Sequence, residues 1–243
     1  MSDLKITPLK IDVAKHKNWG DYEISLKRDG CFMYYIDGML ISSRKVIRSD
    51  RFKHILDILN ANAFKNCYGE MYIEGGNVFD VSRSENWKRA KFMPINLFKS
   101  GLTDEENQEY IQQKVKEISS AFITEKITFN DINEGWEYVL NNNCEGLVLK
   151  HKYSDELFKI KLLQEAKVEI KSHEAGSEKG TFILIDDNRI SGTSREFIVQ
   201  YLDIKSKGEK PIAECEYQFL TKANKMFQPR LRRIYSEGKE CQR

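Results

Sequence analysis

The chain has 243 residues, of which 40% are hydrophobic and 31% are charged, and its formal net charge is +2. This composition is typical of a globular protein with one large domain or two modest ones. The charge is too small to indicate a polyanionic partner by itself. No run approaches the ~18 apolar residues of a membrane span, and the N-terminal residues lack an apolar secretion signal. We therefore expect no membrane partner and a cytoplasmic location, or the host cytoplasm if the protein is viral.

The cysteine pattern argues against two common architectures. The cysteines are Cys31, Cys67, Cys144, Cys215 and Cys241, an odd number without any C-x-x-C pair. A disulfide framework needs paired cysteines, and a structural zinc site needs closely spaced ligands. The four histidines show no ligand spacing either. The pattern fits a reducing compartment.

The first third of the chain predicts two hairpins and a helix. FMYYIDGMLISSR contains Asp37-Gly38, which suits a type I′ turn between two β-rich runs. Ser49-Asp50 then opens a helix whose apolar residues share one face. These residues are Phe52, Ile55, Leu56 and Leu59. CYGEMYIEGGNVFDV is predicted to form a second hairpin that turns at Gly75-Gly76.

Two further helices and two strands follow. Thr103 and Glu106 have the spacing of a capping box, and a helical stripe continues through Ile111, Val115 and Ile118. Asn130 or Asp131 caps the next helix, which is expected to bury Ile132, Trp136 and Val139. GLVLK and LFKIK are predicted to be short strands.

The pattern changes near residue 165. From Ala166 onward the chain consists of short alternating segments, KVEIKSH, GTFILIDD, EFIVQYLDI and AECEYQFL, separated by turns. Such a run of predicted strands is typical of a small all-β barrel or sandwich. The aromatic side chains of these segments occupy positions suited to a core, namely Phe182, Phe197, Tyr201, Tyr217 and Phe219. We expect an α+β domain over residues 1–163 and an all-β domain over residues 164–243.

Four short motifs contain candidate chemical groups. They are Lys27-Arg28-Asp29-Gly30 after the strand-like YEISLK, Glu70 inside an apolar strand, Glu145 to Lys150 in EGLVLK, and Lys159-Ile160-Lys161. Each motif alone has an ordinary interpretation. The first suits a charged turn, the second an exposed acidic residue on a strand, and the lysine pair suits protection of a sheet edge.

In this order the motifs resemble those of the covalent nucleotidyltransferase superfamily, which contains ATP-dependent DNA ligases, RNA ligases and mRNA-capping enzymes. The resemblance covers nearly the whole chain. It implies that Lys27 is the nucleophile that becomes linked to AMP, and that Lys159 and Lys161 are catalytic. It also implies ATP binding by the other matched positions, which are Asp29, Arg44, Glu70, Glu145 and Lys150.

The second domain resembles the OB domain of DNA ligases. SHEAGSEKGTF is similar to its glycine-containing first turn, and EYQFLTKANKMFQPRLRRIY is similar to its last strands. The resemblance implies an adenylation domain with antiparallel sheets and flanking helices, followed by an OB-fold domain. It further implies a nicked duplex DNA partner, contacted by Arg44, Arg230, Arg232 and Arg233.

The residue types suit this chemistry. A lysine amine attacks the α-phosphorus of ATP only when it is neutral, and nearby cations such as Lys150 and Lys159 favour that form. The same cations can neutralise charge that develops on the triphosphate. Glu145 offers a hard oxygen ligand for Mg²⁺, for which Mn²⁺ can substitute, and the resemblance implies Glu70 as a second ligand. The carboxylate of Glu70 can also accept hydrogen bonds from the ribose hydroxyls.

Three positions depart from the family pattern. The arginine expected two residues after the motif I glycine is Phe32. The aromatic residue expected to stack on adenine matches Ile95, with Phe92 and Phe98 as the neighbouring candidates. The terminal arginine, six residues after Pro229, is replaced by Tyr235. The self-adenylation step is the one that these departures affect most.

Several related functions compete. NAD-dependent ligases place an extra domain before the nucleophile, and the 26 residues before Lys27 are too few for it. Capping enzymes usually begin their fourth motif with aspartate, where this chain has Glu145. An RNA ligase and a nick-binding homologue without activity stay open as alternatives. The preferred interpretation is a monomeric ATP-dependent DNA ligase that seals 5′-phosphate/3′-hydroxyl nicks through lysyl-AMP and a DNA-adenylate.

Overall fold

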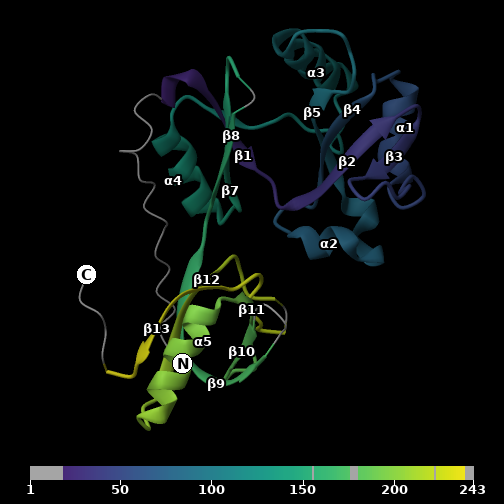
Figure 1. Ribbon diagram of the computed structural model, residues 1–243. Helices are drawn as coiled ribbons and strands as arrows, with labels where there is room; N and C mark the ends of the chain where they lie inside the picture. The colour runs from purple at the N-terminus through teal and green to yellow at the C-terminus, as the bar shows by residue number, and fades with distance from the viewer. Residues whose placement is uncertain (1–18, 155, 176–179, 222, 239–243) are drawn as a thin grey trace. The chain divides into compact units, whose positions relative to one another are not determined.

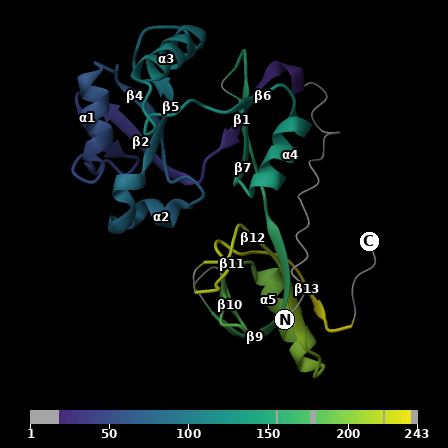
Figure 2. The same cartoon turned by 180° about the vertical axis from the view of Figure 1, so that it is seen from behind.

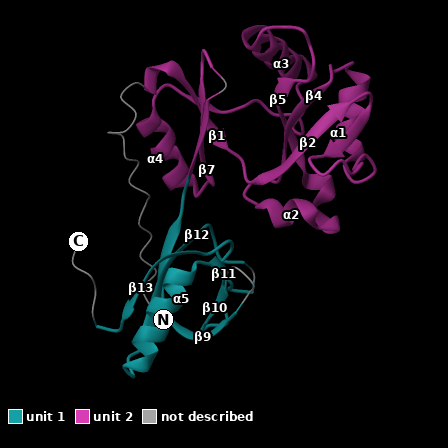
Figure 3. Ribbon diagram, in the orientation of Figure 1, with its two compact units in different colours: residues 1–15, 161–243 teal, residues 16–160 magenta. Residues whose placement is uncertain are grey.

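The computed structural model describes residues 19–154, 156–175, 180–221 and 223–238. They divide into two compact units, one up to Ile160 and the other from Lys161 onward (Figure 3). Residues 176–179, which belong to the expected glycine-containing turn, and Cys241 lie outside the described residues. Mixed helices and antiparallel sheets in the first unit confirm the expected α+β class.

The first unit contains two antiparallel four-stranded sheets (Figure 1). One has the order β6-β1-β7-β8 and consists of β1 (Tyr22–Lys27), β6 (Thr128–Phe129), β7 (Gly146–His151) and β8 (Leu157–Lys161). Helix α4 (Ile132–Asn142) packs against β1 and β7 and lies beside β7 in both views (Figures 1 and 2). Because apolar residues alternate along β1 and β7, Ile24 and Leu149 are buried while Lys27 lies on the other face.

The other sheet has the order β3-β2-β4-β5 and consists of β2 (Gly30–Ile36), β3 (Met39–Ser42), β4 (Cys67–Tyr72) and β5 (Lys91–Leu97). One face of this sheet contributes to the main hydrophobic core with α1 (Lys53–Ala61), α3 (Asp104–Ile118) and the short helix α2 (Val78–Ser82). The first predicted hairpin is confirmed, since β2 pairs with β3 and both Asp37 and Gly38 have positive φ.

The second predicted hairpin is wrong. The chain turns after β4, but residues 78–82 form helix α2 instead of a returning strand. Asn77 caps this helix, because its side chain accepts a hydrogen bond from the Phe79 N–H while Asp80 accepts one from the Asn77 N–H. The alternating pattern of NVFDV is therefore overridden by a local capping box.

The predicted helix starts are confirmed at two of three places. Thr103 and Glu106 form the expected capping box of α3. Asp131, rather than Asn130, caps α4 by accepting hydrogen bonds from two backbone N–H groups. Before α1 the expected Ser49 cap is absent, because Ser49 accepts a hydrogen bond from the Leu40 N–H and the helix begins at Lys53.

The second unit is a five-stranded antiparallel sheet with the order β11-β10-β9-β12-β13. Its elements are β9 (Gln164–Glu174), β10 (Gly180–Leu184), β11 (Arg189–Thr193), α5 (Arg195–Ser206), β12 (Pro211–Tyr217) and β13 (Arg230–Ser236). The edge strands β11 and β13 also contact each other, so the sheet curls toward a barrel. Phe182, Tyr201 and Tyr217 are buried in its core, as expected.

The predicted strand EFIVQYLDI is wrong, because residues 195–206 form helix α5. The segment also contains a helical spacing, in which Phe197, Ile198, Tyr201 and Ile204 lie toward one side. Tyr201 and Ile204 are buried, and Phe197 and Ile198 pack against the barrel core. A short apolar segment can fit both the two-residue period of a strand and the 3.6-residue period of a helix. Here the contacts with the barrel core favour the helix. Among the described residues, no helix is long and apolar enough to span a membrane.

Candidate active site

Lys27 ends β1 and lies opposite Gly146 at the start of β7. This register brings its amine to Glu145, and the distance from Lys27 Nζ to Glu145 Oε2 is 2.5 Å. The side chains are 19% and 9% exposed, so the pair is mostly shielded from water. Two motifs separated by more than a hundred positions are thus joined in one ion pair.

Glu70 lies on β4, directly opposite Phe32 of β2. Burial raises the pKa of its carboxyl group to about 7, while the positive charges of Lys27 and Lys159 lower it and the carboxylates of Glu145 and Asp29 raise it. These opposing effects show that members of the other three sequence motifs lie within electrostatic range of Glu70.

Asp29 and Gly30 have structural reasons for their positions. The carboxylate of Asp29 accepts a hydrogen bond from the Val78 N–H at 3.1 Å, which ties the lysine motif to the start of α2. A Cβ atom on Gly30 would lie 2.3 Å from the Met71 carbonyl oxygen. Only a glycine allows β2 to start this close to β4.

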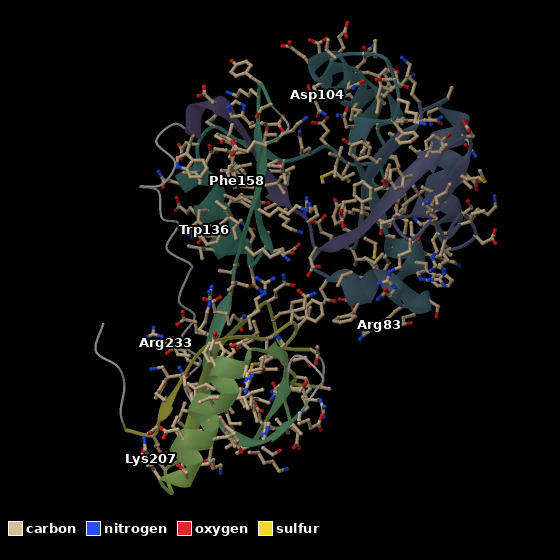
Figure 4. The ribbon with its side chains drawn as sticks, viewed as in Figure 1. Arg83, Asp104, Trp136, Phe158, Lys207 and Arg233 are labelled. Carbon is tan, nitrogen blue, oxygen red and sulfur yellow. The ribbon has the colours of Figure 1, made fainter. Side chains whose placement is uncertain are left out.

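Lys150 is held by a residue that the motifs did not indicate. Its amine forms an ion pair with Asp104, in the first turn of α3 (Figure 4), and Asp104 also accepts a hydrogen bond from Asn96 Nδ2 at 2.8 Å. The hydrogen bonds from Lys150 and Asn96 lower the pKa of Asp104. This arrangement ties the end of β7 to β5 through the start of α3.

A second connection, which starts from β1, joins the same two sheets through α3. Lys126 Nζ lies 2.5 Å from Glu23 Oε1 on β1 and 3.2 Å from Gln108 Oε1 on α3. Gln108 Nε2 in turn donates a hydrogen bond of 2.7 Å to the Ile95 carbonyl. No local pattern marks these residues, because their partners lie on other elements.

The two lysines of β8 lie on an edge strand, which also fits the simpler interpretation that they protect a sheet edge. Lys159 is exposed, and its positive charge lowers the pKa of Glu70. Because side chains alternate along a strand, Lys161 lies on the same face of β8 as Lys159. Arg44 is exposed in the turn after β3 and forms no ion pair with any described residue.

The candidates for adenine stacking lie on different faces. Phe92 is fully buried, sits opposite Met71 and belongs to the hydrophobic core, so it does not share a face with Glu70. The ring of Phe98 instead packs 5.8 Å from the ring of Tyr34, on the Glu70 side of the sheet. Ile95, the position that matches the motif, is half-buried in β5.

The arginines of β13 differ in their surroundings (Figure 4 labels Arg233). Arg232 lies 2.5 Å from Glu216, and Arg233 lies 3.3 Å from Glu214, both on the neighbouring strand β12. Arg230 is exposed and has no ion pair within the described part of the chain. Two of the three expected phosphate-binding arginines therefore already have carboxylate partners.

The carboxylates of the candidate site could hold a divalent metal only together with ligands from a substrate. In the residues described, no three His, Cys, Asp or Glu side chains lie close enough to hold a metal ion. Mg²⁺ at nucleotide sites usually takes one or two carboxylates plus substrate phosphates, so Glu145 beside Lys27 fits that role. Burial raises the pKa of Glu70 to about 7, which disfavours its ionised form, so this group suits hydrogen bonding to a hydroxyl better than metal binding.

Comparison with solved structures identifies the fold. A Lig E DNA ligase, described as binding DNA with a minimal scaffold, aligns over 92% of this chain and 96% of its own with a TM-score of 0.68 and 18% identity. The ligase domain of Mycobacterium tuberculosis LigD aligns over 90% of this chain and 91% of its own, with a TM-score of 0.52 and 12% identity.

No protein-family model matches the sequence, and no curated protein matches it. The two structural alignments show that the chain has the fold of these DNA ligases, an α+β domain of the nucleotidyltransferase type followed by an OB fold, at low sequence identity. This confirms the expected fold.

Proposed function

We propose that the protein is an ATP-dependent DNA ligase that seals 5′-phosphate/3′-hydroxyl nicks in duplex DNA. The observation that carries the proposal is the shielded pair of Lys27 and Glu145, 2.5 Å apart and within electrostatic range of Glu70. A lysine held beside a carboxylate, with further lysines nearby, is the set of groups that covalent nucleotidyl transfer needs. The proposed domains are an adenylation domain over residues 1–163 and an OB-fold domain over residues 164–243.

The proposed reaction has three displacements. The neutral amine of Lys27 attacks the α-phosphorus of ATP and a phosphorus–nitrogen bond forms. The bond to pyrophosphate breaks, pyrophosphate leaves, and the amine releases one proton to water. The 5′-phosphate of the nick then displaces the lysine and takes the AMP. Finally the 3′-hydroxyl attacks that 5′-phosphate, loses its proton and releases AMP.

The residues around Lys27 have separate roles in this proposal. Glu145 orients the amine before attack, and Glu70 holds a ribose hydroxyl. Lys159, Lys161 and Lys150 place positive charge against the phosphates. Mg²⁺, or Mn²⁺ in its place, would be held by Glu145 and would reduce the charge of the triphosphate. Asp29 positions the lysine motif through α2. Arg44 and Arg230 are free of ion pairs among the described residues and are proposed to contact DNA phosphates.

The first test is adenylation. Incubation with α-labelled ATP and Mg²⁺ should label the wild-type protein, and Lys27→Ala should abolish the label, because no other lysine is paired in this way with a shielded carboxylate among the residues described. Lys53→Ala, on the exposed surface of α1, is the matched control and should label normally. A labelled Lys27→Ala protein would show that the nucleophile is misassigned, and labelling by GTP would indicate a capping enzyme.

The second test concerns the substrate. Sealing is compared on nicked DNA, nicked RNA, nicked hybrids and single-stranded RNA at one salt concentration. A duplex nick already holds the 3′-hydroxyl beside the activated phosphate, so we expect nicked DNA to be sealed fastest. Faster sealing of RNA would make the protein an RNA ligase of the same superfamily.

One observation favours a second candidate, a homologue that binds nicks without sealing them. The usual arginines of motif I and of the last strand are replaced by Phe32 and Tyr235, and Arg232 and Arg233 are paired with glutamates. Binding of nicked DNA without any labelled adduct would support this candidate.

A further inference from the structure

The face of sheet β3-β2-β4-β5 opposite the core is unusually aromatic. Four rings define this aromatic face: Phe32, Tyr34, Tyr68 and Phe98. Their centroids are 5.1 Å apart for Phe32 and Tyr34, 5.5 Å for Phe32 and Tyr68, and 5.8 Å for Tyr34 and Phe98. All four are half-buried. A sheet face that is not packed on the core normally carries polar residues, so this face calls for an explanation.

The strand register connects the aromatic face to the candidate active site. Phe32 lies directly opposite Glu70, and Tyr34 lies directly opposite Tyr68, so the side chains of these residues share one face, and the Phe98 ring packs against Tyr34 on it. Glu70 is within electrostatic range of Lys27. The rings therefore extend along the strands away from the residue that we propose to be the nucleophile.

Cations border the aromatic face on two sides. Ile41 lies opposite Tyr34 and forms a β-bridge with Ile47, which is 60% exposed. The turn between Ile41 and Ile47 contains Arg44 and Lys45. On the other side Lys99 places its amine 5.3 Å from the centre of the Phe98 ring. Aromatic rings can stack on unpaired bases, and the lysine and arginine residues around them can contact phosphates, so this surface suits a single-stranded nucleic acid.

We propose that the aromatic face binds unpaired nucleotides at the end of the strand to be joined, by stacking their bases on Tyr34, Tyr68 and the neighbouring rings. The flanking cations would contact the phosphates. The proposal rests on the proposed ligase function in so far as it assigns the bound strand to the joining reaction. It adds a substrate class, ends with frayed or overhanging nucleotides, that the duplex nick does not include.

Base stacking can be separated from phosphate contacts in the wild-type protein. Fluorescence anisotropy would compare a 5′-phosphorylated oligothymidylate with an abasic oligonucleotide of the same length and charge. We expect the base-bearing strand to bind at least about tenfold more tightly, since several stacked bases are lost together. Equal affinity for the two strands would overturn the proposal. An oligouridylate shows whether the sugar is also read, and ring-dependent binding of either sugar supports the proposal.

Variants then test the rings. Tyr34→Leu with Tyr68→Leu keeps apolar volume but removes two rings, and should weaken oligothymidylate binding about tenfold. Tyr34→Phe with Tyr68→Phe keeps both rings and should bind as the wild type does. Tyr138→Leu on α4 is a matched control away from this face. If circular dichroism shows that the double leucine variant does not fold, the comparison of base-bearing and abasic strands in the wild-type protein still tests the proposal.

Other occupants of the face give different results. A dimer in sedimentation that competes with the oligonucleotide would make the face a protein interface and overturn the proposal. Adenylation of Lys27 together with ring-independent strand binding would overturn this inference alone. Ring-dependent binding without adenylation would instead contradict the ligase function and leave the aromatic face as a nucleic-acid surface.

Discussion

Glu70 shows at the scale of a residue how the fold changes chemistry. Burial raises the pKa of its carboxyl to about 7, from an ordinary value of 4.5. The ionised form is thus penalised in the folded protein. A group of this kind contributes its full stability below pH 4.5, and that stability is lost as the pH rises through about 7.

We therefore predict that Glu70→Gln removes a pH dependence. From pH 5 to pH 8 the wild type should lose about 2 kcal/mol of unfolding free energy relative to the variant, less than the full shift because the group is partly hydrated. Urea unfolding at both pH values measures this difference. Glu105→Gln, at an exposed position, is the control. If the difference in unfolding free energy between the wild type and Glu70→Gln is the same at pH 5 and pH 8, the carboxyl of Glu70 is solvated.

At the scale of an element, the glycine of the lysine motif sets the pairing of β2 with β4. We predict that Gly30→Ala destabilises the protein by about 3 kcal/mol or more, because the added Cβ meets backbone that cannot rotate away. Gly20→Ala is the control, since nothing lies within 4 Å of that position. Thermal unfolding of both variants provides the comparison, and equal Tm values would contradict the close approach.

The cap of α4 is a second prediction at this scale. Asp131 accepts hydrogen bonds from the N–H groups of Asn133 and Glu134, at 2.8 and 3.0 Å. Asp131→Ala should lower the unfolding free energy by about 1 kcal/mol, and Asn130→Ala should have a smaller effect. Because α4 covers the back of β1, the loss is also expected to slow adenylation at Lys27. A larger effect for Asn130→Ala would assign the cap to that residue.

At the scale of the whole molecule, the two units have separate hydrophobic cores. Phe182 is fully buried in the barrel, and Phe52 is 2% exposed in the first unit. Each Phe→Ala substitution should cost about 3–5 kcal/mol in its own unit. Hydrogen exchange should then lose protection within residues 161–238 for Phe182→Ala and within residues 19–160 for Phe52→Ala. Equal loss in both units would show that they unfold as one cooperative body.

The sequence by itself determined features whose signals are local. The Asp37-Gly38 turn and the Thr103 capping box involve residues two to four positions apart, so their hydrogen bonds can be read directly from the chain. The order of the lysine and glutamate motifs also predicted the fold, since each residue type suits one role. The predictions from local signals were wrong where one segment fitted both a strand and a helix, as in α2 and α5.

Tertiary structure decided everything that depends on register and packing between distant segments. The pairing of Lys150 with Asp104, the assignment of Phe92 to the core, and the shared face of Tyr34 and Tyr68 follow from strand pairing. The raised pKa of Glu70 follows from burial, which no spacing encodes. These features arise from contacts between residues far apart in the chain, and a one-residue change of register would place each side chain on the opposite face.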